Sequence, residues 1–303
     1  MSFSYTVKEE IIQSNSGKSE YEAMLLGMLM YSKSFSCEQI LLQTENDKAA
    51  ECFSLLLGQV LKDTDAVTIQ TVSRNKRSPL YLISIDKAQD REAVIDYFKL
   101  NPHSNNGYFP LKSVVKKKHF GAFTAGAFLS CGSVSDPLKE YHLEFVIPDL
   151  MLCNTLGEVF LELGITAKQT ERKKSYVVYL KESENIEDAL TFMGAPKSSL
   201  EIMNVKILKN VRNKINRAVN CDSANIEKTI KASEKQIEAI EKIEKNSGLD
   251  SLPDDLIEIA QLRRENPDWS LKELGASLSE PISRSGANHR MNRILTLAFG
   301  EKH

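Results

Sequence analysis

The chain lacks the features that mark most enzymes and secreted proteins. Its five cysteines (Cys37, Cys52, Cys131, Cys153 and Cys221) are widely separated and form no Cys-x-x-Cys pair, so neither a disulfide framework nor a structural zinc site is expected. There is also no P-loop, no Gly-x-Gly-x-x-Gly fingerprint and no pair of histidines at metal-binding spacing. The sequence therefore predicts no cofactor and no bound metal.

Long apolar runs and an excess of charge of one sign are also missing. The longest apolar run near the N-terminus, 23–30, is too short to span a bilayer, and no basic leader precedes it. We expect a cytoplasmic protein with no membrane partner. The formal net charge of −2 means that any signal for nucleic-acid binding must come from local clusters of charge.

Helical and strand-like segments recur in one order in the first two thirds of the 303 residues. Asn46 or Asp47 is expected to begin one helix, and Asp149 is expected to cap its equivalent, which should end at Gly164. Matching landmarks lie at similar offsets, because Gly27 and Gly126 are 99 residues apart while Asn46 and Asp149 are 103 apart. Similar offsets indicate an internal duplication, with repeats over about 20–100 and 118–195.

The segment GAFTAGAFLSCGSV (121–134) consists almost entirely of small and apolar residues. Glycine inside a helix costs about 1 kcal/mol relative to alanine, which suggests that Gly121 and Gly126 have a packing role. A helix face without side-chain bulk lets another backbone approach closely. We predict that the small-residue helices of the two repeats pack together, the alternative being an ordinary buried helix.

The C-terminal segment has the pattern of a helix-turn-helix. Helices are expected over 253–265, over 270–278 with Ser270 as N-cap, and from about Ser283 to Ala298. The last helix should bury Ala287, Met291, Ile294, Leu295 and Ala298 on one face. The residues expected to contact DNA are Lys272, Arg284, Ser285, Asn288, His289, Arg290, Asn292 and Arg293. The alternative is a three-helix bundle that contacts protein.

Five stretches, two of which overlap, resemble a known family. TAGAFLSCG (124–132) and LLGMLMYSK (25–33) look like the paired LAGLIDADG helices of homing endonucleases. Together with QTEN (43–46), GAFLSCGSVSDPLKEYHLEF (126–145) and SLKELGASLSEPISRSGANHRMNRI (270–294), they make the whole chain resemble the WhiA family of Gram-positive bacteria. The resemblance implies transcriptional control linked to cell division, chromosome segregation or sporulation.

The expected fold class is α+β. A duplicated LAGLIDADG-like domain should occupy 1–220, a helical linker 221–248 and an all-α helix-turn-helix domain 249–303.

The endonuclease motifs have lost their metal ligands. The carboxylate that precedes the final glycine of each motif holds a divalent metal in the enzymes, and Ser32 and Cys131 stand at those positions here. Lys33 also replaces the glycine of the first motif. We therefore expect no catalytic residues. A metal-dependent endonuclease that uses Asp136, and an adaptor that binds a cell-division protein, are the alternative functions.

Several basic clusters could neutralise DNA phosphates. The expected partners are double-stranded DNA and, in addition, a transcription or cell-division protein. The candidate phosphate contacts are Lys116, Lys117, Lys118, Arg172, Lys173, Lys174, Lys206, Lys209, Arg212, Lys214 and Arg217.

Overall fold

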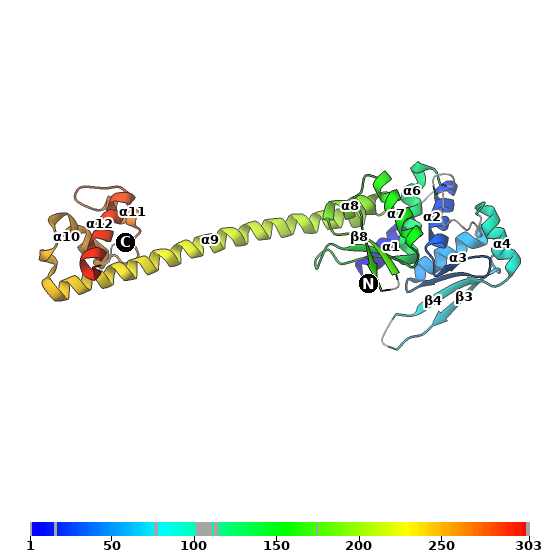
Figure 1. Ribbon diagram of the computed structural model, residues 1–303, viewed down its shortest axis with the longest axis horizontal. Helices are drawn as coiled ribbons and strands as arrows, with labels where there is room; N and C mark the ends of the chain where they lie inside the picture. The colour runs from blue at the N-terminus through cyan, green and yellow to red at the C-terminus, as the bar shows by residue number, and fades with distance from the viewer. Residues whose placement is uncertain are drawn as a thin grey trace. The chain divides into compact units, whose positions relative to one another are not determined.

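The structure, a computed structural model, describes residues 2–14, 17–75, 78–100, 111, 115–173 and 175–300. The chain divides into two compact units, Met1–Lys209 and Asn210–His303. Figure 1 shows the first unit as mixed helices and sheets and the second as helices. The α+β fold class is confirmed, with a duplicated first unit and an all-helical second one.

The first unit contains two copies of one element order. The first copy comprises α2 (Lys18–Met30), β1 (Ser34–Phe35), β2 (Ile40–Thr44), α3 (Asp47–Leu61), β3 (Val67–Val72), β4 (Leu80–Ile85) and α4 (Ala88–Tyr97). The second comprises η1 (Lys117–His119), α6 (Phe120–Cys131), β5 (Gly132–Val134), β6 (Leu143–Ile147), α7 (Leu150–Glu162), β7 (Lys168–Arg172), β8 (Ser175–Leu180) and α8 (Ser183–Phe192). Each copy forms an antiparallel sheet, in the order β1-β2-β4-β3 or β5-β6-β8-β7. The matching orders confirm the duplication.

The caps predicted for the two equivalent helices are present. The side chain of Asn46 accepts a hydrogen bond from the Ala49 backbone at 2.7 Å, and that of Asp149 accepts one from Leu152 at 3.0 Å. Gly164 follows the end of α7 with a φ of +79°, a conformation that favours glycine. The short strands β1 and β5 were not predicted from the sequence.

An unpredicted N-terminal helix, α1 (Phe3–Ser14), ties the first unit together. The Tyr5 hydroxyl donates a hydrogen bond to Asp47 at the start of α3, at 2.8 Å. The Glu10 carboxylate accepts hydrogen bonds from the backbone N–H groups of Lys197 (2.6 Å) and Ser198 (2.9 Å). These groups open α9 (Pro196–Ser247), so Glu10 caps a helix that it precedes by almost 190 residues.

The helical segment predicted over 221–248 is part of the longer helix α9. The boundary expected at residue 220 therefore lies within a continuous helix. Ser198 and Ile202 of α9 are buried in the first unit, whereas Ala239 and Ile240 belong to the core of the second.

The second unit adds η2 (Leu249–Ser251), α10 (Asp254–Glu265), α11 (Leu271–Ala276) and α12 (Arg284–Phe299) to the last turns of α9. The three predicted helices are confirmed. Ala287, Met291, Ile294 and Leu295 of α12 are buried as expected, and Ala298 is half-buried.

Backbone contact between α2 and α6 joins the two repeats. A Cβ added to Gly27 would overlap the carbonyl oxygen of Phe123, and one added to Gly126 would overlap that of Met24. This reciprocal contact confirms that the small-residue helices pack closely. Gly121 has a different partner, because a Cβ there would overlap the carbonyl oxygen of Phe192 at the end of α8.

We predict that Gly126→Ala destabilises the first unit by about 3 kcal/mol, because the added methyl group must push two backbones apart. Gly157→Ala in α7 is the control, since its new Cβ would meet only the movable amide of Gln169. Urea denaturation followed by far-UV circular dichroism measures the change. Fluorescence of the single tryptophan, Trp269, reports the second unit and should not shift. Equal stability of the two variants would contradict the close contact.

Candidate nucleic-acid interface

Local hydrogen bonds and a glycine shape the start of α11 and the turn between α11 and α12. The Ser270 hydroxyl accepts from the Glu273 backbone and the Glu273 carboxylate accepts from the Ser270 backbone, which makes a capping box. The Ile282 N–H donates to the Gly275 carbonyl at 2.9 Å. A Cβ on Gly275 would lie 2.7 Å from the Ile282 carbonyl oxygen, so glycine permits this close turn.

A buried arginine supports the loop that precedes the turn. Arg263 is only 1 % exposed, and its Nη1 donates to the carbonyl oxygens of Trp269 (2.7 Å) and Pro267 (3.2 Å). Glu258 of α10 also accepts from the backbone and hydroxyl of Ser279, at 2.6 and 2.8 Å. Sequence reasoning missed Arg263, because nothing in its pattern distinguishes it from the neighbouring exposed arginine, Arg264.

The solvent face of α12 carries short polar side chains. Ser285 and His289, predicted opposite the buried face, are exposed, and so are Asn288 and Asn292, which were predicted to flank them. Their amide, hydroxyl and imidazole groups can hydrogen-bond to base edges, asparagine pairing best with adenine. Since no acidic residue occurs over 281–300, this face carries no charge that would repel DNA.

The cations around this face differ in their surroundings. Arg284 and Lys272 are exposed, and Arg290 is half-buried with no ion pair to any described residue. Arg293 pairs with Asp255 of α10 at 2.5 Å, and both side chains are about 41 % exposed. Because an exposed ion pair is worth little, Arg293 could exchange Asp255 for a phosphate at small cost.

In the first unit, four of the predicted phosphate contacts already have partners within the chain. Lys117 pairs with Glu162 at 2.9 Å and Arg172 with Glu144 at 3.5 Å. Lys206 pairs with Glu184, and its hydrogen bond lowers the pKa of that carboxyl to about 2. Lys209 donates to the Pro137 carbonyl at 2.7 Å and lies 4.7 Å from the ring centroid of Tyr141.

The other predicted phosphate contacts that the structure describes have no such partners among the described residues. Lys116, Lys118 and Lys173 are exposed and form no ion pair with any residue that the structure describes. Lys174 lies outside the described residues. In the second unit, Arg212, Lys214 and Arg217 of α9 are exposed, again with no ion pair in the described part of the chain.

The positions of the lost metal ligands offer poor donors to a divalent cation. The Ser32 hydroxyl is buried and donates to the Leu29 carbonyl at 2.7 Å. Burial raises the pKa of the Cys131 thiol to about 12, so the thiol is neutral. Asp136 instead accepts from the Leu138 backbone at 2.9 Å, as its position in a turn predicts. No cluster of three or more His, Cys, Asp or Glu side chains suited to a metal occurs among the described residues.

A lysine from α1 supplies the positive charge at the C-terminal end of α6. Lys8 Nζ donates to the Leu129 carbonyl at 3.1 Å and lies 5.5 Å from the ring centroid of Phe128. Burial lowers the pKa of Lys8 to about 8. A cation is favourable at a helix C-terminus, where carbonyl groups lack helical partners. The side chains present therefore do not fit a Mg²⁺ site, and Lys8 stands beside one of the former ligand positions.

No helix in the described part of the chain is long and apolar enough to cross a lipid bilayer.

We predict that Lys8→Met changes how stability depends on pH. The lowered pKa of Lys8 means that the unfolded chain binds more protons than the native one between about pH 8 and 10.5, so wild-type stability rises with pH there. The free energy of unfolding of Lys8→Met relative to wild type should fall by about 2 kcal/mol from pH 7 to pH 10. Urea midpoints measure this, and the exposed Lys18→Met is the control. A constant difference would show that Lys8 titrates normally.

Comparisons with known proteins agree with this arrangement. The family description "WhiA C-terminal HTH domain" matches residues 215–298, and "WhiA LAGLIDADG-like domain" matches 120–212. "Probable cell division protein WhiA" of Lachnoclostridium phytofermentans is 39 % identical over 99 % of both chains, and that of Caldicellulosiruptor saccharolyticus is 42 % identical over 84 % of this chain and 80 % of its own. The crystal structure of full-length DUF199/WhiA from Thermatoga maritima has 23 % identity, complete coverage of both chains and a TM-score of 0.59. The chain belongs to the WhiA family of cell division proteins and carries that family's helix-turn-helix domain.

Proposed function

We propose that this protein is a sequence-specific, DNA-binding transcriptional regulator without nuclease activity. The observation that carries the proposal is the face of α12, where Ser285, Asn288, His289 and Asn292 are exposed together beside a tight turn. Such a helix can enter the major groove of double-stranded DNA. Membership of the WhiA family extends the proposal to genes of cell division, chromosome segregation or sporulation and to association with the nucleoid.

The proposed division of labour follows the chemistry of the side chains. Asn288 and Asn292 would bind base edges and so determine sequence preference. Arg284, Arg290 and Lys272 would bind phosphates, with Arg293 joining them once it leaves Asp255. These phosphate contacts raise affinity for any duplex by releasing counterions, and they make binding sensitive to salt.

Further phosphate contacts are proposed on the part of α9 that belongs to the second unit. Arg212, Lys214 and Arg217 have no ion-pair partner among the described residues, whereas Lys206 and Lys209 would each have to break an internal contact. Arg172 would likewise have to leave Glu144. The three α9 residues are therefore better placed than the first unit's paired cations to bind a phosphate backbone.

Variants of α12 should separate sequence recognition from general affinity. Sites would first be selected from random duplexes by the full-length protein, and affinity would then be measured by anisotropy over a salt series. Asn288→Ala/Asn292→Ala should reduce the preference for the selected site over a scrambled one at least tenfold, with little change in the salt slope. Arg284→Gln/Arg290→Gln should weaken binding to both duplexes and reduce the slope.

The control for this experiment is Lys231→Gln, which removes a cation that already pairs with Glu227 on α9 at 2.7 Å. It should leave both affinities near the wild-type values. If the two asparagines contribute nothing to the preference for the selected site, α12 does not read sequence in the proposed way.

The proposed lack of nuclease activity is tested with supercoiled plasmid in Mg²⁺ or Mn²⁺. We expect the plasmid to stay intact, because a buried hydroxyl, a neutral thiol and the Lys8 ammonium do not form a divalent-metal site. Cleavage that requires metal and is lost in Asp136→Ala would instead support the endonuclease alternative. Asp188→Ala, an exposed acid on α8, is the matched control.

One observation favours the alternative of a protein-interaction adaptor in cell division. Within the second unit, α9 exposes apolar side chains that are each 49–61 % accessible: Val211, Ile215, Val219, Ile226 and Ile230. Exposed apolar stripes mark protein contacts more often than DNA contacts. The adaptor function would replace that of a DNA-binding regulator if the full-length protein binds no duplex DNA even at low salt.

A further inference from the structure

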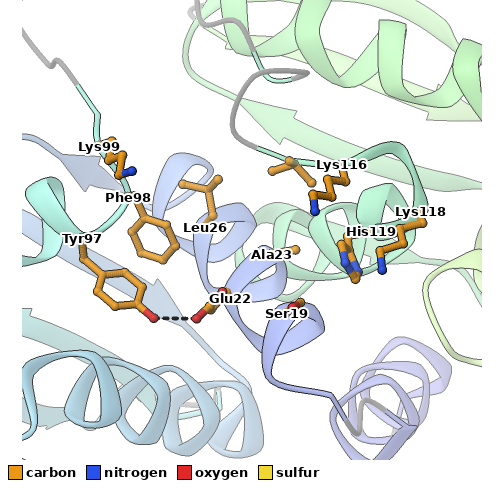
Figure 2. Close-up of a pocket in the computed structure, with 11 residues that line it drawn as sticks. Ser19, Glu22, Ala23, Leu26, Tyr97, Phe98, Lys99, Lys116, Lys118 and His119 are labelled. Atoms are coloured by element: carbon orange, nitrogen blue, oxygen red, sulfur yellow. Dashed lines mark hydrogen bonds between the residues drawn. The ribbon is translucent and has the colours of Figure 1, made fainter.

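A cavity of about 570 Å³ opens in the first unit where the two repeats meet (Figure 2). Its walls come from the first turns of α2, the end of α4, and the chain that enters α6. The lining residues are Ser19, Glu22, Ala23, Leu26, Tyr97, Phe98, Lys99, Val115, Lys116, Lys118 and His119. Both repeats therefore contribute to one site.

The cavity lies at the opposite end of the helix pair from the former metal positions. Glu22 and Ala23, near the start of α2, share the cavity with His119, which directly precedes α6. At the other end, the Ser130 hydroxyl near the end of α6 donates to the Met28 carbonyl near the end of α2, at 2.9 Å. The positive ends of both helix dipoles therefore point toward the cavity, and α6 has no acid in its first turn.

Positive charge exceeds negative charge in this cavity. Lys99, Lys116 and Lys118 form no ion pair with any described residue. Among the lining residues that the structure describes, Glu22 is the single carboxylate, and it accepts a hydrogen bond from the Tyr97 hydroxyl at 2.6 Å (Figure 2). The sequence between Tyr97 and Ser135 contains no acidic residue that could neutralise the lysines. The cavity is therefore suited to an anion.

The walls also contain a polar atom without a partner and an apolar surface. His119 Nδ1 is buried and has no hydrogen-bond partner among the described residues. Because this nitrogen is out of contact with solvent, it is not a binding group for a ligand in the cavity. Leu26, Phe98 and Val115 are buried side chains that supply the apolar part of the lining. An inorganic anion would contact the lysines but gain nothing from these side chains.

We propose that this cavity binds a phosphorylated small molecule of nucleotide size. The lysines bind the phosphate groups, and the wall formed by Tyr97 and Phe98 packs against the organic part. A volume of about 570 Å³ falls within the range of pockets for such ligands. Because the lining comes from both repeats, the ligand bridges them and stabilises the first unit when it binds.

Isothermal titration calorimetry on the full-length protein tests this proposal with ADP, ATP, pyrophosphate and inorganic phosphate at matched ionic strength. We expect one molecule of ADP or ATP to bind per chain, and inorganic phosphate to bind at least tenfold more weakly. Lys116→Gln/Lys118→Gln should weaken nucleotide binding at least tenfold, and Lys99→Gln should weaken it independently.

The chain provides a matched control between the two altered lysines. Lys117 lies on the same turn but pairs with Glu162 and does not line the cavity, so Lys117→Gln should keep the wild-type affinity for nucleotide. ADP should raise the midpoint of thermal unfolding for wild type and for Lys117→Gln, and should leave the midpoint of the double variant unchanged.

Four outcomes would overturn the proposal. The first is that none of the four probes binds. The second is that Lys117→Gln weakens nucleotide binding as much as the double variant does. The third is that phosphate binds as tightly as ADP and ATP, which would mean that only the anion is recognised. The fourth is a double variant that loses affinity for duplex DNA but not for nucleotide, which would make these lysines contacts to the DNA backbone.

Discussion

The contact between α2 and α6 is the constraint on which the first unit depends. Gly27 and Gly126 occupy equivalent places in the two repeats, and each leaves room for a carbonyl oxygen of the other helix. Two backbones that touch in this way fix the relation between two sheets that share no hydrogen bonds in their ladders. The pair of helices also creates two distinct chemical environments, a cationic cavity where the helices begin and the former metal positions where they end.

Much of the fold could be predicted because its signals are local. The alternation of apolar residues, the caps at Asn46, Asp149 and Ser270, and the repeated order of elements identified nearly every helix and strand of the two repeats and of the second unit. The sequence did not predict the N-terminal helix α1, because this helix buries only Val7 and Ile11 and its other contacts include hydrogen bonds to residues far away in the sequence. The extent of α9 was missed because basic composition was interpreted as a surface cluster rather than as a helix.

The candidate site was less predictable, because residue type does not reveal an internal partner. The exposed face of α12 follows from helical periodicity and agrees with the structure. Lysines and arginines that look equivalent in the sequence separate into those held by a carboxylate or carbonyl, such as Lys206 and Lys209, and those left in solvent, such as Lys214. The cavity between the repeats depends on residues almost a hundred positions apart, so only tertiary structure brings them together.

The position of Lys8 has a consequence for metal binding at the end of α6. A carboxylate introduced at position 131 would lie close to the Lys8 ammonium group at the C-terminal end of α6 and would pair with it rather than with a metal ion. Such a substitution would produce an internal ion pair with Lys8, so a divalent-metal site at this position would require a second substitution in a different helix. The N-terminal helix α1 thus helps to determine which chemistry the far end of α6 can support, although α1 lies outside both repeats.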